Sequence, residues 1–113
     1  MQDEDNSATL ILITAASTEA AKELCFQLVE ARSISGANLL TSCTTIYRED
    51  DQVLTGTECL ILARTLRKKT DEIATIVGNF DSDLEVSVIS ATQLSASYRA
   101  WIDSSISHEG ELA

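Results

Sequence analysis

The chain opens with an apolar segment followed by a helical pattern. Residues Ala8 to Thr14 form a continuous apolar and β-branched run, which is typical of a central strand buried on both faces. From Ser17, a residue that can cap a helix, apolar residues recur at helical spacing as far as Ala31. Gly36 can adopt a positive φ, so we predict that the helix stops in the segment that ends there.

Two long extended segments follow this helix. Ala37 to Ile46 and Val53 to Ala63 are rich in Thr, Leu and Ile, and a charged loop, Arg48 to Gln52, separates them. Strands of about ten residues reach roughly 33 Å, which is well beyond the usual strand length. Two short helices cannot cover such a hairpin. We therefore expect its far end to pair with something outside the chain, since a long open edge promotes aggregation.

A second helix and a fourth strand complete the pattern. Thr65 or Thr70 can begin this helix, which carries an apolar stripe, and Gly78 is predicted to end it. After a polar loop, residues Leu84 to Ala91 begin with the alternation of apolar and polar side chains that is typical of a strand.

A short helix is predicted to close the domain. Ser95 precedes a segment in which Tyr98 and Trp101 share one face, and we interpret both aromatic residues as packing residues. The order β-α-β-β-α-β with a short C-terminal helix predicts an α+β fold of the ferredoxin-like kind, with an antiparallel sheet. At 113 residues we expect one domain over residues 8–106, with flexible acidic tails at 1–7 and 107–113. This fold alone predicts no function.

Composition and charge narrow the classes of partner. Apolar residues make up 44% and charged residues 23%, a balance that favours a globular domain over a disordered one. The net charge of −10 repels phosphate backbones and anionic lipid, so we expect neither nucleic acid nor membrane as a partner. No apolar run approaches the roughly 18 residues that span a bilayer, and the first residues are acidic where a secretion signal is basic. The cytoplasm is the expected compartment.

Residues for catalysis are scarce. Cys25, Cys43 and Cys59 form an odd set without a CxxC pair, so we interpret them as reduced and mostly buried. The only histidine, His108, falls in the predicted tail, and the four glycines are too scattered for a phosphate-binding loop. Without a base to activate a cysteine or serine, we predict that the protein is not an enzyme and name no catalytic residue.

One cluster of carboxylates is a candidate metal site. Asp81, Asp83 and Glu85 alternate along the chain, and in an extended segment their side chains would share one side. Carboxylates without imidazole or thiolate suit hard cations such as magnesium, calcium or manganese. The simpler alternative is a charged edge that stays soluble and unpaired.

Several stretches of the chain resemble the divalent-cation tolerance (CutA) family. They are Leu10-Ile-Leu-Ile-Thr-Ala-Ala, Tyr47, Glu58 with Leu62-Ala-Arg-Thr65, and Tyr98-Arg-Ala-Trp101-Ile102, within a resemblance that runs from Ala8 to Ile106. The resemblance implies a homotrimer related in architecture to the PII signalling proteins and implicated in tolerance of divalent cations, copper among them. It also implies that clefts between subunits are lined by Tyr47, Glu58, Arg64 and Trp101. For Glu58, simple alternation toward solvent is the equal alternative.

The chain departs from the family pattern where the family binds metal. Ile13 replaces the usual cysteine of the first strand, and the His-Pro-Tyr-Glu-like stretch reads Gly78 to Glu85 here, with Glu85 retained. The resemblance therefore implies a divalent cation as the cofactor, copper by family, while two of the three usual ligands are missing. The alternative function is a PII-like signalling module that binds a small molecule or a protein.

Overall fold

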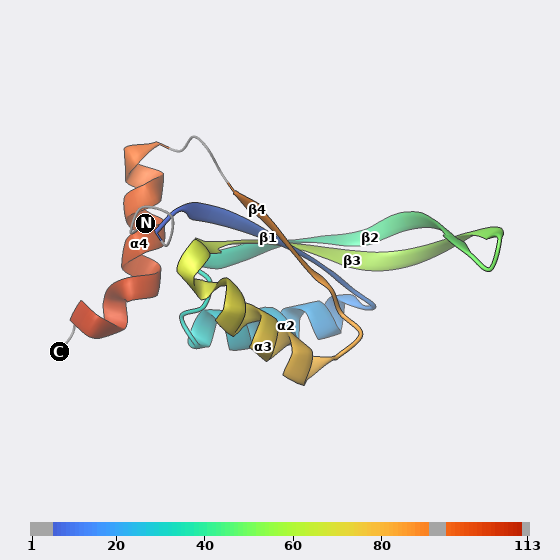
Figure 1. The fold of residues 1–113 in the computed structure, drawn as a ribbon, viewed down its shortest axis with the longest axis horizontal. Helices are drawn as coiled ribbons and strands as arrows, with labels where there is room; N and C mark the ends of the chain where they lie inside the picture. Colours follow the sequence, from blue (N-terminus) through green and yellow to red (C-terminus); the bar gives the residue numbers. More distant parts are fainter. Residues whose placement is uncertain (1–5, 91–94, 112–113) are drawn as a thin grey trace.

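The computed structural model describes residues 6–90 and 95–111. Its element order confirms the predicted α+β fold, with a helix added at the C-terminal end (Figure 1). In chain order the elements are β1 (Ala8–Ala15), α2 (Thr18–Glu30), β2 (Gly36–Glu49), β3 (Gln52–Leu66), the 3₁₀ turn η1 (Arg67–Lys69), α3 (Thr70–Phe80), β4 (Val86–Ser90) and α4 (Ala96–Glu111).

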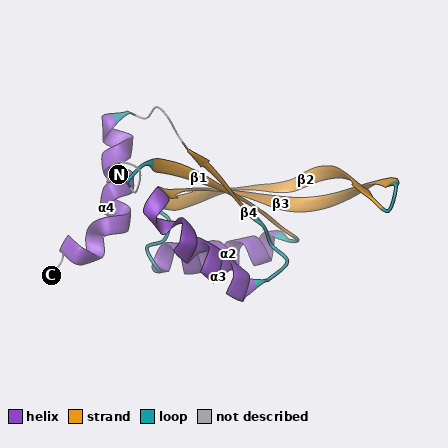
Figure 2. Ribbon diagram, viewed as in Figure 1, coloured by secondary structure: helices purple, strands orange, loops and turns teal. Residues whose placement is uncertain are grey.

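The four strands form one antiparallel sheet in the order β2-β3-β1-β4. Helices α2 and α3 lie against one face of this sheet (Figure 2). The main core lies between these two layers, where Ile11, Ile13 and Ile61 pack against Leu24 and Leu28 with almost no exposed surface. Because β1 is central, both of its neighbours are strands, which explains its nearly continuous apolar sequence.

The opposite face of the sheet is also apolar, and a helix covers it only at the end near Arg64 and Leu66, where α4 (Ala96–Glu111) packs. Side chains alternate along a strand, so the residues between the buried ones of β1 and β3 point away from α2 and α3. The register places Leu40 opposite Leu60, Leu62 opposite Leu12, and Leu10 opposite Ile89. Leu40 and Ile89 are 47% and 45% exposed. We call the six leucine and isoleucine residues of these pairs the helix-free face.

The hairpin of β2 and β3 is longer than the sequence predicts. Its strands have 14 and 15 residues, and it projects beyond the helices (Figure 1) along the 52 Å long axis of the molecule. The predicted charged loop shrinks to a two-residue turn, because Glu49 pairs with Gln52. Asp50 and Asp51 close this turn with φ angles of 52° and 66°, the left-handed conformation that a tight hairpin turn requires.

The predicted helix start is confirmed for α2, but both glycine stops are wrong. The Ser17 side chain accepts a hydrogen bond from the Ala20 N–H at 3.1 Å, as expected of a cap. The helix ends at Glu30 with Ala31 as its C-cap, and the residue that takes the left-handed conformation just beyond it is Arg32, with a φ of 60°. Gly36 instead begins β2. Gly78 lies inside α3, which continues to Phe80.

The closing helix is not short, because α4 has 16 residues. It packs through a small cluster of its own, in which Ile102 and Ile106 meet Leu66 and Tyr98. Residues 107–111, predicted as tail, continue the helical backbone, while residues 1–5 and 112–113 lie outside the described part. Within residues 6–90 and 95–111, no helix is both long and apolar enough to cross a membrane.

Candidate functional site

A β-bulge in β2 determines which side chains meet on the hairpin. Leu40 pairs with Leu60, but the next pair is Cys43 with Glu58, so Thr41 and Ser42 together lie opposite a single residue of β3. Ser42 adopts a φ of 58°, which accommodates the extra residue. Since residues directly opposite each other share a face, the bulge brings the later odd-numbered residues of β2 to the face of Glu58.

A small groove lies on the hairpin just past this bulge. It has a volume of about 360 Å³ and is lined by Ala16, Thr45, Tyr47, Gly56, Thr57 and Glu58. The half-buried carboxylate of Glu58 accepts a hydrogen bond from Thr45 Oγ1 at 2.5 Å, which fixes its orientation. Tyr47 remains 42% exposed. We call this the Glu58 groove. Its carboxylate and phenol can accept hydrogen bonds from hydroxyl or ammonium groups.

Arg64 and Trp101 form a second pair, where α4 contacts β3. The guanidinium carbon of Arg64 lies 6.0 Å from the centre of the Trp101 ring, a cation–π contact between β3 and α4. Arg64 Nη1 also donates to Asn38 Oδ1 at 2.5 Å. Trp101 stacks on Tyr98 with ring centres 5.8 Å apart and is 43% exposed, so its predicted packing role is only partly correct.

The four predicted cleft residues therefore form two pairs within one chain. Glu58 and Arg64 share β3 but are six residues apart, a separation of about 20 Å along a strand. Tyr47 belongs with Glu58, and Trp101 belongs with Arg64. Whether the pairs approach each other between subunits stays a prediction.

The predicted alignment of three carboxylates is wrong. Asp81 and Asp83 precede β4, with a turn at residues 82–83, and the Asp83 N–H donates to Asp81 Oδ1 at 3.0 Å. The segment with Glu85 is therefore not the continuous extended one that would align the three side chains. In the described part of the chain, no three carboxylate, thiol or imidazole groups gather as a metal site requires. The side chain of His108 lies outside the described residues.

The cysteines are unpaired, as the sequence predicts. Cys25 and Cys59 are buried in the main core, and Cys43 is half-buried beside the bulge. Burial raises the pKa of the Cys25 thiol from 9.0 to about 11, and the nearby Cys59 adds to this effect. Cys25 is therefore protonated near neutral pH and is a poor nucleophile.

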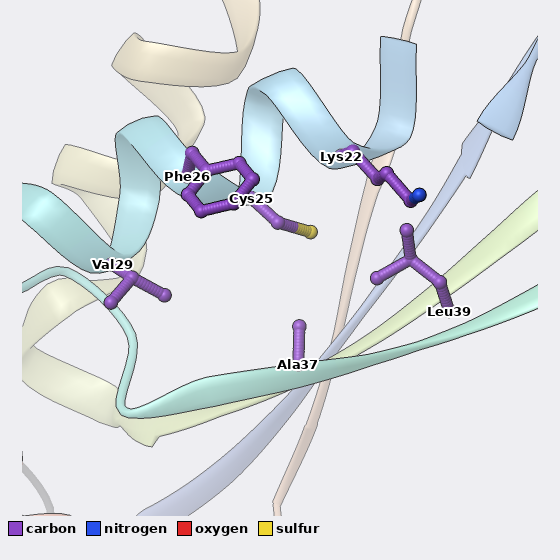
Figure 3. Close-up of a pocket in the computed structure, with 6 residues that line it drawn as sticks. All are labelled: Lys22, Cys25, Phe26, Val29, Ala37 and Leu39. Carbon is purple, nitrogen blue, oxygen red and sulfur yellow. The ribbon is translucent and has the colours of Figure 1, made fainter. Parts of the chain in front are cut away.

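A second, apolar groove escapes prediction from the sequence. It has a volume of about 500 Å³ and lies between α2 and β2, with Phe26 and Cys25 on the helix facing Ala37 and Leu39 on the strand (Figure 3). Phe26 is 70% exposed. The sequence contains one signal for this groove: Phe26 is apolar but lies outside the stripe of buried residues on its helix.

Comparisons with known proteins agree with this architecture. The family model described as CutA1 divalent ion tolerance protein matches residues 9–105. No curated protein matches the chain.

Solved structures share the fold at low sequence identity. The divalent ion tolerance protein CutA1 from Ehrlichia chaffeensis has a TM-score of 0.84 and 19% identity, over 89% of this chain and 96% of that one. The divalent cation tolerance protein Cut A1 from Thermus thermophilus has a TM-score of 0.79 and 25% identity, over 84% and 94%. CutA from Synechococcus elongatus, solved in complex with a Bis-Tris molecule, has a TM-score of 0.81 and 22% identity, over 90% and 96%.

Proposed function

Because the chain belongs to the CutA1 divalent ion tolerance protein family, we propose that it acts in tolerance of, or response to, divalent metal cations. We further propose that it acts as a homotrimer and not as an enzyme. The observation that carries the assembly is the helix-free face, a contiguous apolar surface of the kind that marks an interaction site.

The shape of the sheet supports a closed ring of copies. Its two edge strands, β2 and β4, are different elements, so pairing of β2 of one copy with β4 of the next would join unlike surfaces. Such head-to-tail contacts generate a ring when the rotation closes. The number three comes from the family resemblance. Covering the projecting hairpin with a second copy would also protect its long edge.

Light scattering after size exclusion tests the assembly. We expect a mass of three times 12.2 kDa for the full chain. Leu40→Asp places a charge on the helix-free face and should lower this mass, because burying an unpaired carboxylate in an interface is unfavourable. Phe26→Asp, an exposed apolar residue of α2, is the matched control and should leave the mass unchanged. A monomeric mass for the unmodified protein would refute the proposed trimer.

The metal proposal is limited to weak binding of a divalent cation. Copper and zinc prefer imidazole and thiolate ligands. The buried thiol of Cys25 is held protonated, and the acidic residues near β4 offer only carboxylates. Asp81, Asp83 and Glu85 thus fit a hard cation better than copper, and they need a change in the turn at residues 82–83 to converge.

Calorimetric titration with copper, zinc and magnesium tests metal binding. We expect heat with at least one of them, and Asp83→Asn should reduce it if the cluster is the site. The matched control Asp71→Asn removes an exposed carboxylate from the first turn of α3. No heat with any of the three cations would remove the metal-binding role from the proposal.

The alternative function is a module that binds a small molecule or a protein in the manner of the PII proteins. The Glu58 groove favours this alternative, because it combines an oriented carboxylate with an exposed phenol. The Synechococcus relative is described in complex with Bis-Tris, a polyhydroxylated amine. Titration with Bis-Tris distinguishes the two functions. Saturable binding that Glu58→Gln abolishes and Glu49→Gln retains would favour the module, whereas equal binding by both variants would count against the groove.

A further inference from the structure

The guanidinium of Arg64 is a partly buried cation without a counter-ion among the described residues. Its backbone is fixed in the middle of the sheet, where Arg64 pairs with Leu10 and with Gly36. In the described part of the chain, the ion pairs formed by side chains belong to other cations, and the acceptor for Arg64 is the neutral amide of Asn38. Buried charged donors are normally paired. A negative group from elsewhere is therefore expected at this position.

The unsatisfied donor marks the edge at which such a group would bind. Arg64 Nη1 is occupied by Asn38, whereas the buried Nε has no acceptor among the described residues. In a planar guanidinium, Nε–H and one Nη2–H point to the same side and form the fork that matches the two oxygens of a carboxylate. The free edge of Arg64 is thus suited to bidentate binding of a carboxylate.

Gly36 lies directly beside this edge. A Cβ atom at Gly36 would lie 3.1 Å from Arg64 Nη2 and 3.4 Å from Trp101 Cη2. Because Gly36 has no positive φ, the backbone does not require glycine here. The absence of a side chain instead lets the guanidinium and the indole approach the backbone of β2 closely, and a Cβ here would crowd the Nη2 side of the fork.

Trp101 covers the guanidinium from α4. Its ring lies over Arg64 and remains 43% exposed. Helix α4 is held by its own small cluster around Leu66 and Ile102, separate from the main core. Since Nε is buried in this arrangement, a ligand that reaches it must displace a neighbour. The partly exposed indole is the side chain placed to move.

We propose that Arg64, Gly36 and Trp101 form a carboxylate-binding site. The carboxylate docks on the Nε–Nη2 edge of Arg64, and the indole of Trp101 shifts to form one wall of the site. The carboxylate comes either from a small organic acid or from an acidic side chain of a second copy of this acidic chain. The site goes beyond the proposed role in cation tolerance and does not depend on it.

The single tryptophan makes this site directly observable. Emission of Trp101 in the full-length protein would be followed while malonate replaces chloride at constant ionic strength. Arg64→Lys keeps the charge but loses the fork, and Arg67→Lys is the matched control at an exposed arginine three residues away. Gly36→Ala is a second variant, which keeps Arg64 and places a Cβ against Nη2. Circular dichroism establishes that each variant is folded.

Two results support the site and identify the source of the carboxylate. A saturable change with malonate, weakened about tenfold or more by Arg64→Lys or Gly36→Ala and retained by Arg67→Lys, supports a small organic acid. The second result is no response to malonate, together with a change in Trp101 emission when the protein is diluted and its copies separate. If Arg64→Lys shifts this change to a higher protein concentration, the carboxylate comes from a second copy. If the emission responds to neither, or if Arg64→Lys and Gly36→Ala respond as the unmodified protein does, the proposal is overturned.

Discussion

The burial of Cys25 predicts a specific loss of stability at alkaline pH. Cys25 as a whole residue is 8% exposed, and burial raises the pKa of its thiol from 9.0 to about 11 in the native protein. Below pH 9 the thiol is protonated in both the folded and the unfolded chain, so it does not make stability depend on pH. As the pH rises from 9 to 11, the unfolded chain releases this proton while the native protein retains it, and the free energy of unfolding falls.

The size of this loss follows from the two pKa values. Each pKa unit corresponds to about 1.4 kcal/mol, so the difference between 9.0 and about 11 corresponds to about 2.7 kcal/mol. Above the native pKa both states are ionised and the loss is complete. This loss is a substantial fraction of the roughly 5–15 kcal/mol that stabilises a typical domain.

Urea unfolding across this pH range, with a reducing agent present and protein concentration fixed, measures the loss. Cys25→Ala removes the thiol, so its free energy of unfolding should fall less across this pH range than that of the unmodified protein, by up to about 2.7 kcal/mol. The variant starts from a lower stability because the substitution leaves a small cavity. Leu24→Val is the matched control, since it also truncates the core side of α2 but removes no ionisable group. Equal losses in the unmodified protein and in Cys25→Ala would refute the reasoning.

Three further predictions concern stability in urea. Asp51→Gly should raise the free energy of unfolding by several tenths to about 1 kcal/mol, because glycine adopts the φ of 66° without strain; a decrease would contradict this account of the turn. Ser17→Ala should lower it by about 1 kcal/mol, and Ser17→Gly by only a few tenths, through loss of the helix cap. Ile61→Ala should lower it by about 2–5 kcal/mol, because it leaves a cavity in the fully buried core, and a loss below about 1 kcal/mol would show that the core collapses around it.

The order and type of the elements were predictable because they depend on local patterns. The apolar run at Ala8–Ala15 and the cap at Ser17 carry their information within a few residues. The ends of helices were less predictable. Glycine is the usual residue at a positive φ, but here Arg32, Ser42, Asp50 and Asp51 adopt it. Gly36 instead lies where Arg64 and Trp101 approach, a reason that no local pattern contains.

The candidate sites depended on register, which the sequence does not specify. The individual residues Tyr47, Glu58, Arg64 and Trp101 could be selected, but their division into two pairs follows from strand positions and from the contact of α4 with β3. The acidic residues near β4 illustrate the opposite case. Their alternation suggests one shared side only if the backbone is extended, and the turn at residues 82–83 removes that condition.

The bulge at Thr41 and Ser42 makes β2 tolerant of a change in length. Both bulge residues lie opposite a single residue of β3, so removing one of them would leave a regular ladder in which Leu40 still pairs with Leu60 and Cys43 still pairs with Glu58. Thr45 and Tyr47 would keep their places in the Glu58 groove, and the change would be confined to the local bend and twist of the strand. Relatives that differ by one residue at this point can therefore share both the fold and the hairpin surface.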